Sequence, residues 1–221
     1  MVKARATPRP LRVDAELNRD RIVDAAQAAF AEDGLDVPLE DIAQRAGVGI
    51  ATLYRRFPTR IDLIAACFEG RVAHYADSAA QALQAPDAWS GFCGHVQRIC
   101  AMQTADRGLK DVLTRTFPNA KALEAQRTRG YQLTLCVIER AKSEGVLRTD
   151  FVSQDVVLLL MANAGIVEAT GPDAAAVSQR LVAYLLEAFR ADRAERAEPL
   201  PPPPTEQAMI RAMRRAGKLS R

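Results

Sequence analysis

The segment from Leu39 to Phe57 carries the residue types with the clearest chemistry in this chain. Its second half holds two adjacent arginines, Arg55 and Arg56, and no acidic residue. An arginine guanidinium can donate two parallel hydrogen bonds to O6 and N7 of guanine. Apolar residues recur at helical spacing on both sides of Gly47-Val48-Gly49, which predicts two short helices around a glycine turn. This pattern is typical of a helix-turn-helix, which lays its second helix in the major groove of DNA.

The apolar spacing of the second helix decides which of its side chains face away from the core. With Ile50, Leu53 and Phe57 turned inward, helical geometry turns small, hydroxylated and cationic side chains outward. These outward residues are Ala51, Thr52, Arg55 and Arg56. A small Ala51 allows close approach to base edges and contact with a thymine methyl group. We expect the ring of Tyr54 to pack against the core while its hydroxyl reaches a phosphate.

The residues that follow the arginines support this interpretation. Pro58 cannot continue the helix, and Thr59 and Asp62 have the spacing of a capping box for the next one. The N–H groups at the start of that helix favour an anion, so Arg60 is a candidate phosphate contact. Two adjacent arginines are also typical of an ordinary solvated helix face. The glycine turn, the apolar spacing and the proline together favour DNA contact.

The rest of the chain predicts helices and no strands. Ordered structure is expected from about Asn18, a first helix ends at Gly34, and Pro38 begins the second. The expected core of these helices is Phe30, Ile42, Val48, Leu53 and Phe57. Later helices are predicted at Arg60–Gln84, Ala88–Thr104, Lys110–Arg115, Ala120–Ser143, Gln154–Ala169 and Ala174–Arg193. Because no alternating pattern of apolar and polar residues occurs, the predicted fold class is all-α.

Composition narrows the class of protein but does not identify it. The chain has 221 residues, 48% of them hydrophobic, and a net charge of +3 that is too small to argue nucleic-acid binding by itself. Its four cysteines form no C-x-x-C pair, so we expect reduced, mostly buried thiols and neither a metal site nor a cofactor. No signal peptide is visible, and the most apolar run, Val156 to Val167, is too short to span a bilayer. We therefore expect a cytoplasmic protein with no membrane partner, and this run as a buried helix.

The stretch from about Arg19 to His74 resembles the N-terminal domain of TetR-type transcriptional regulators. The resemblance is carried by FAEDG at Phe30–Gly34, LEDIA at Leu39–Ala43 and AGVGIATLYRRFP at Ala46–Pro58. It implies phosphate contacts at Thr52, Tyr54 and Arg60, and base contacts at Ile50, Ala51 and Arg56. Two departures from the family pattern matter. Gly49 replaces a frequent serine, so the second helix lacks a side-chain N-cap, and Arg56 replaces a frequent histidine, so no operator sequence carries over.

The resemblance also implies a larger helical C-terminal domain that dimerises and binds a small effector. The predicted organisation is a flexible basic arm at 1–16, a helix-turn-helix domain at 17–66, an effector-binding and dimerisation domain at 67–195, and a proline-rich spacer with a basic tail at 196–221. The arm carries Lys3, Arg5, Arg9 and Arg12, which either track phosphates or form an ordinary solvated terminus.

Apolar helix faces in the C-terminal part predict a homodimer, with an ordinary core within one chain as the alternative. The candidate interface residues are Val157, Leu160, Val177, Leu181, Tyr184, Leu185 and Ala188. A candidate effector pocket combines an apolar stripe with nearby polar groups. Its residues are Trp89, Phe92, His95, Val96, Ile99 and Asn163, with a satisfied structural core as the alternative for His95 and Asn163.

These observations predict a ligand-responsive dimeric regulator, expected to be a repressor, that binds double-stranded operator DNA. An alternative is a DNA-binding regulator without a small effector, controlled by a protein partner or by its abundance. The spacer Pro199–Pro204 and the basic tail after it would then be a docking segment or an additional DNA contact, with an ordinary solvated end as the other interpretation. A helical enzyme is a distant third, because the chain has no nucleophile elbow, phosphate-binding glycine loop or H-E-x-x-H motif. The sequence assigns no catalytic residue, effector identity or operator.

Overall fold

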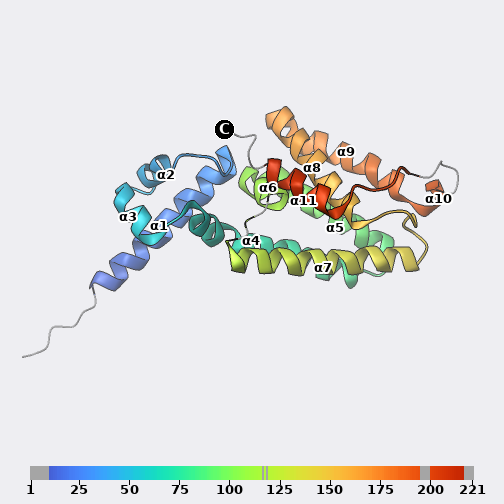
Figure 1. Ribbon diagram of the computed structural model, residues 1–221, viewed down its shortest axis with the longest axis horizontal. Helices are drawn as coiled ribbons and strands as arrows, with labels where there is room; N and C mark the ends of the chain where they lie inside the picture. The colour runs from blue at the N-terminus through green and yellow to red at the C-terminus, as the bar shows by residue number, and fades with distance from the viewer. Residues whose placement is uncertain (1–9, 116, 118, 195–199, 217–221) are drawn as a thin grey trace, which may run out of the picture.

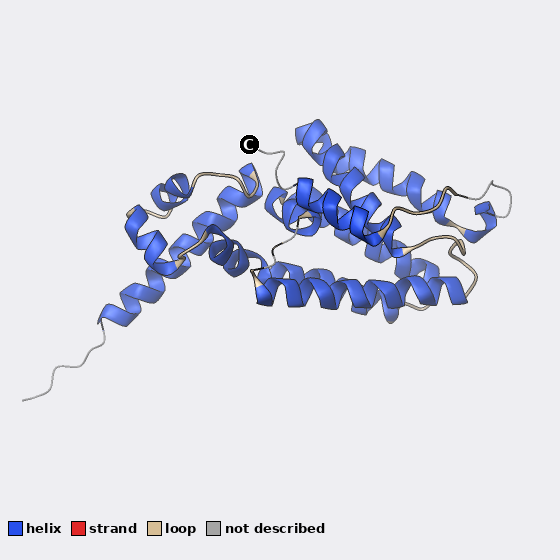
Figure 2. Cartoon of the chain, in the orientation of Figure 1, coloured by secondary structure: helices blue, strands red, loops and turns tan. Residues whose placement is uncertain are grey.

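A computed structural model describes residues 10–115, 117, 119–194 and 200–216 of the chain. Within these residues every regular element is helical, which confirms the all-α prediction (Figures 1 and 2). The α-helices are α1 (Pro10–Asp33), α2 (Leu39–Arg45), α3 (Ile50–Arg56), α4 (Arg60–Leu83), α5 (Ala88–Ala105), α6 (Arg107–Thr114), α7 (Lys121–Ser143), α8 (Ser153–Thr170), α9 (Ala174–Phe189), α10 (Ala191–Ala194) and α11 (Glu206–Ala216). A 3-10 turn, η1 (Gly171–Asp173), separates α8 from α9.

Helix α1 begins earlier than its sequence predicted. It starts at Pro10 rather than near Asn18, so the predicted arm is helical from residue 10 onward. A proline is tolerated in the first turn of a helix, and neither glycine nor proline occurs between Pro10 and Gly34 to stop the helix. The arm residues Lys3, Arg5 and Arg9 lie outside the described residues.

Helices α1, α2 and α3 form a compact head with the predicted core. Phe30, Ile42 and Leu53 are fully buried, Phe57 nearly so, and Val48 is half-buried against them. Gly34 and Gly47 adopt positive φ angles of 80° and 65°, which only glycine adopts without strain, and these set the two turns of the head. We call α1–α3 the reading head.

Helix α4 joins the reading head to the rest of the molecule. Thr59 accepts a hydrogen bond from the Asp62 N–H (3.2 Å), and Asp62 accepts one from the Thr59 N–H (2.9 Å), so the predicted capping box is confirmed. The helix then runs unbroken to Leu83 and packs along α7. The predicted domain boundary after residue 66 therefore falls inside a continuous helix. The reading head and the bundle are therefore connected by one unbroken helix.

The last long predicted helix is shorter than expected. It ends at Phe189 because Arg190 takes an extended backbone conformation opposite Leu147. The Phe189 carbonyl accepts a hydrogen bond from the Arg148 N–H (3.0 Å), and the Ala191 N–H donates one to the Val146 carbonyl (3.1 Å). These bonds fix the turn after α7 against the end of α9.

The stretch Ser153–Phe189 is apolar and long enough, by composition, to resemble a membrane span. The turn η1 divides it into α8 and α9, which pack against each other. Only 28% of its most apolar window is buried, and Leu158 is 41% exposed. The expectation that Val156–Val167 is a buried helix is therefore wrong for one of its faces.

Helix α6 is wedged between the reading head and the bundle. Gly108 lies against Phe30 of α1 and Phe68 of α4: a Cβ built on Gly108 would come 2.9 Å from the Phe30 carbonyl oxygen and 2.6 Å from the Phe68 ring. These are distances that real Cβ atoms essentially never show. A side chain at this position would therefore push α6 away from the reading head.

We predict that Gly108→Ala lowers the free energy of unfolding by about 1–3 kcal/mol, because it overpacks this junction. The matched control is Gly70→Ala in α4, where a Cβ meets no atom within 4 Å. There the loss of glycine flexibility should stabilise the helix by about 0.5–1 kcal/mol. Chemical denaturation of both variants measures the difference. Equal unfolding free energies would contradict a close junction.

Candidate DNA-binding surface and ligand cavity

The outer face of α3 has the character that its sequence predicted. Leu53 is fully buried, whereas Ala51, Arg55 and Arg56 are exposed. Among the described residues, no hydrogen bond or ion pair engages either arginine of this face. Tyr54 is 45% exposed, and Ile50 and Thr52 are half-buried at the edge of the face. The guanidinium groups are therefore available to an anionic partner.

Arg60 has a role that the sequence did not predict. Its Nη1 donates hydrogen bonds to the carbonyls of Leu35 (2.8 Å) and Val37 (2.6 Å). The side chain thus ties the start of α4 to the turn between α1 and α2. The N–H groups of Arg60 that these two hydrogen bonds do not use can still donate to a DNA phosphate, and that contact remains a prediction.

Two further arginines contribute to the reading head without forming part of the α3 face. Arg45 donates to Glu32 and Asp33, both at 2.9 Å, and this pairing raises the pKa of its guanidinium. Arg19 of α1 places its guanidinium 5.7 Å from the centre of the Phe57 ring. The sequence carried no signal for either contact, because each joins residues that are distant along the chain.

A cavity of about 240 Å³ lies between α7, α8 and the C-terminal helix α11, and we call this candidate site the ligand cavity. Its apolar wall consists of Leu113, Val156, Val157, Leu160, Met209, Ile210 and Met213. Its polar lining consists of Tyr75, Glu124, Arg127, Thr128, Tyr131, Thr134, Ser153, Gln154 and Glu206. Most of this polar lining is engaged internally. Arg127 donates to Glu124 (3.0 Å), and the Tyr131 hydroxyl donates to Ser153 (3.0 Å).

None of the six residues predicted for a pocket lines this cavity. Phe92, Val96 and Ile99 are core residues that are at most 1% exposed. Trp89 stacks on Phe92 (5.8 Å between ring centres) and lies under the Arg190 guanidinium. The prediction located the apolar stripe of α5 correctly but not its partners, since α5 turns this stripe toward α9 and Phe151.

His95 belongs to a closed chain of buried hydrogen bonds. Its Nε2 lies 3.0 Å from the Thr134 hydroxyl, its Nδ1 lies 3.1 Å from Ser78, and Tyr75 lies 3.1 Å from Thr134. Thr134 donates its only proton to the Gly130 carbonyl, so it accepts from both His95 and Tyr75. The neutral Nε2–H tautomer satisfies every member of the chain. Burial and the charge of Arg98 lower the pKa of His95 to about 4.

Asn163 is also satisfied within the fold. Its amide nitrogen donates to Gln103 (2.8 Å), and its amide oxygen accepts from the Ser178 hydroxyl (2.6 Å). Gln103 in turn donates to the Leu160 carbonyl (3.3 Å). The structural alternative therefore holds for both polar residues of the predicted pocket.

The predicted dimer residues divide into two groups. Val157 and Leu160 of α8 line the ligand cavity instead of an outer surface, and Leu160 is only 6% exposed. On α9, Tyr184 is 61% exposed and Ala188 is exposed, while Val177, Leu181 and Leu185 are half-buried beside them. On α8 the exposed residues at helical spacing are Leu158, Ala162, Gly165 and Ala169. We call the exposed sides of α8 and α9 together the α8–α9 face.

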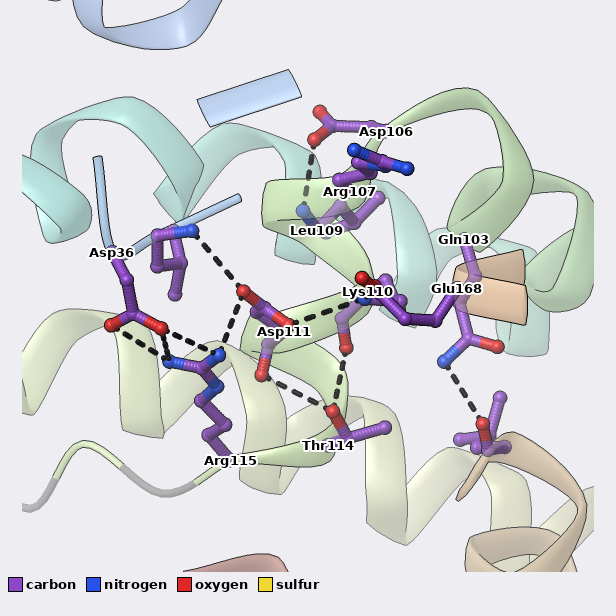
Figure 3. A network of polar contacts seen from close by, with 12 residues as sticks. Asp36, Gln103, Asp106, Arg107, Leu109, Lys110, Asp111, Thr114, Arg115 and Glu168 are labelled. Atoms are coloured by element: carbon purple, nitrogen blue, oxygen red, sulfur yellow. Dashed lines mark hydrogen bonds and ion pairs between the residues drawn. The ribbon is translucent and has the colours of Figure 1, made fainter. Parts of the chain in front are cut away.

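A network of charges links the bundle to the reading head (Figure 3). Asp111 of α6 accepts a hydrogen bond from the Leu35 N–H (3.1 Å) and pairs with Arg115 (3.0 Å). Arg115 also pairs with Asp36 (3.1 Å), and Lys110 pairs with Glu168 of α8 (2.5 Å). Burial raises the pKa of Asp111 despite these cations, whereas Lys110 lowers the pKa of Glu168. Residues of α8, α6 and the α1–α2 turn are thus held in one arrangement.

Comparisons with known proteins relate the reading head of this chain to a family of transcriptional regulators. Residues 22–67 match the model of bacterial regulatory proteins of the tetR family. An HTH-type transcriptional regulator of Staphylococcus aureus is 41% identical over 54 residues, which span 24% of this chain and only 29% of that relative. A TetR transcriptional regulator of Streptomyces coelicolor is 32% identical, with 78% of this chain and 98% of that one covered and a TM-score of 0.49.

A solved structure of lower sequence identity shares the fold of this chain. A Bacillus subtilis transcriptional regulator solved in complex with stearoyl-CoA is 15% identical, with a TM-score of 0.55 over 77% of this chain and 98% of that one. At this identity the likeness concerns the fold alone. It covers both the helical head and the helical bundle.

The buried neutral His95 predicts an acid-sensitive fold. Its pKa is about 4 in the folded chain and near 6.5 when unfolded, so the unfolded chain binds more protons between these values. Stability is therefore fully present above pH 6.5 and falls as the pH drops toward 4. As the pH falls from 7 to 4.5, His95 should lower the free energy of unfolding by about 2.5 kcal/mol. We measure the free energy of unfolding of the wild type and of His95→Gln at both pH values and at equal protein concentration. The difference between the two proteins should shrink by that amount as the pH falls. Parallel pH profiles would contradict it.

Proposed function

This chain belongs to the TetR family of bacterial regulatory proteins, and from that premise we propose that it is a homodimeric repressor released from its operator by a small effector. Membership makes it a transcriptional regulator with a DNA-binding helix-turn-helix and sets aside the helical-enzyme alternative. We place its action in the cytoplasm, where bacterial DNA lies. The observation that carries the proposal is the exposed Arg55–Arg56 face of α3.

The proposed DNA contact follows from the exposed groups of α3. Arg56 and Ala51 face solvent on the side that would enter a major groove, and we assign base contacts to them and to Ile50. Thr52 and Tyr54 lie at the edge of the face, where hydroxyl groups reach the phosphates that flank a groove. Arg55 adds a cation at the same edge. Arg60 contributes mainly by holding the α1–α2 turn in place.

Dimerisation is supported by the α8–α9 face. One α3 helix offers only a few base contacts, whereas two linked heads gain affinity through effective concentration. Two-fold symmetry makes such an interface self-complementary, and the exposed apolar side chains of α8 and α9 would be buried in a four-helix arrangement. The two α3 helices would have to lie about 34–36 Å apart to enter successive major grooves.

The effector response is supported by the position of the ligand cavity next to α6. Leu113 of α6 lines the cavity, and Gly108 of the same helix lies against Phe30 of the reading head. A ligand that displaces Leu113 would move α6 together with Asp111 and Arg115, which hold the α1–α2 turn. The equilibrium shifts only by the difference in ligand affinity between the two head spacings. The Bacillus subtilis regulator with the same fold was solved in complex with stearoyl-CoA, so a protein of this fold can hold a small-molecule ligand.

We predict that Arg56→Ala lowers operator affinity about 5–150-fold and relaxes selectivity at one base pair. Selection from a random DNA pool identifies the operator, and binding isotherms on that operator and on single-base variants measure the effect. The matched control is Arg45→Ala, because Arg45 is already paired with Glu32 and Asp33. Its affinity should change little. Unchanged discrimination in Arg56→Ala would refute the base-reading role, and affinity independent of salt would refute DNA binding itself.

We predict that Tyr184→Glu weakens the dimer by at least tenfold, because a carboxylate at an apolar two-fold interface is desolvated opposite its own copy. Sedimentation velocity over a concentration series measures the dissociation constant. Gln179→Glu, an exposed position on another side of α9, introduces the same charge and should leave the dimer intact. Equal dissociation constants for the two variants would exclude the α8–α9 face as the interface.

A further inference from the structure

The C-terminal helix α11 forms a wall of the ligand cavity. It follows the exposed proline spacer 201–204 and begins after Thr205, whose hydroxyl accepts from the Ala208 N–H (3.2 Å). Met209 is only 5% exposed, and Ile210 and Met213 also line the cavity. In Figure 1 this helix lies across the bundle beside α8. The alternative of a solvated end is therefore wrong for 206–216, which dock onto their own chain.

Helix α11 docks through an apolar face, and its opposite face is exposed to solvent. Glu206, Met209, Ile210 and Met213 follow helical spacing and all reach the cavity, whereas Gln207, Arg211 and Arg215 are exposed. Among the described side chains of α11, none forms a hydrogen bond or ion pair with the bundle. Methionine side chains are flexible and adapt to different apolar surroundings. The contact can therefore open without leaving a buried charge or an unpaired polar group.

The volume of the ligand cavity also bears on the role of α11. About 240 Å³ remains with α11 in place, and ligand sites of drug-sized molecules usually measure roughly 300–1,000 Å³. The paired Tyr131–Ser153 and Arg127–Glu124 groups leave the apolar wall as the main source of affinity. Apolar ligands larger than this space need the volume that Met209, Ile210 and Met213 fill.

We propose that α11 is an intramolecular competitor of the effector: an apolar ligand binds by displacing α11, which the proline spacer keeps at high local concentration. This rests on the proposed function for the identity of the cavity as the effector site. The docking strength of α11 then sets the effector concentration at which the regulator responds. By linkage, whatever undocks α11 raises the affinity of the ligand, and the ligand undocks α11.

The neutral apolar dye Nile red serves as the probe on the full chain. The test variant is Met209→Glu, and the matched control is Gln207→Glu, which introduces the same charge on the exposed side of α11. Met213→Glu provides a second variant on the cavity side. Fluorescence titration gives the dye affinity, and hydrogen–deuterium exchange of residues 206–216 reports docking of the helix. Thermal unfolding of each variant verifies that the bundle is intact.

We expect Met209→Glu and Met213→Glu to exchange rapidly in α11 and to bind the dye at least about tenfold more tightly than the wild type, with Gln207→Glu unchanged. In the wild type, the dye should accelerate exchange in α11. Three results would overturn the proposal: dye that slows exchange in α11, equal or weaker dye binding by the cavity-side variants, or no dye binding by any variant. Operator binding is measured separately, so its loss would count against the proposed function without affecting these outcomes.

Discussion

The arrangement of this molecule depends on how α6 is held between the reading head and the bundle. Gly108 brings α6 against Phe30 and Phe68 at a distance that excludes any side chain. At the same junction, Asp111 accepts a hydrogen bond from the Leu35 N–H and forms an ion pair with Arg115. Buried ion pairs contribute little net stability, because desolvation offsets their attraction, but breaking one leaves an uncompensated charge. The junction therefore tolerates few positions of the head relative to the bundle.

This constraint connects two surfaces that are distant in the fold. The arginine face of α3 belongs to the head, and the α8–α9 face belongs to the bundle. The Lys110–Glu168 pair joins α6 to α8, so the junction also reaches the proposed dimer face (Figure 3). In a symmetric dimer the spacing of the two heads would be set by the α8–α9 face and by this junction together. Packed interfaces change between discrete arrangements, so in the proposed mechanism a shift of α6 would change the position of α3.

The sequence predicted those parts of the molecule that local rules determine. The glycine turn, the apolar spacing of α3 and the Thr59–Asp62 capping box each lie within a few residues and were confirmed. The ligand cavity was not predicted, because it depends on which faces of α7, α8 and α11 meet. Periodicity identified the apolar stripe on α5 but not its neighbours, so core residues such as Phe92 were assigned to a pocket. For the same reason the contact of Arg60 with Val37 had no signal in the sequence.

The tail shows how composition and packing lead to different conclusions. Read as composition, 206–221 is a basic segment with one acidic residue, which is typical of a solvated end. Read at helical spacing, Met209, Ile210 and Met213 share one apolar face, which a water-exposed helix would leave without a partner. The ligand cavity supplies that partner. A helix of this length is marginal on its own in water, so its formation and its docking are coupled. Any ligand that takes its place therefore opposes both at once, and the free energy of folding α11 becomes part of the effector equilibrium.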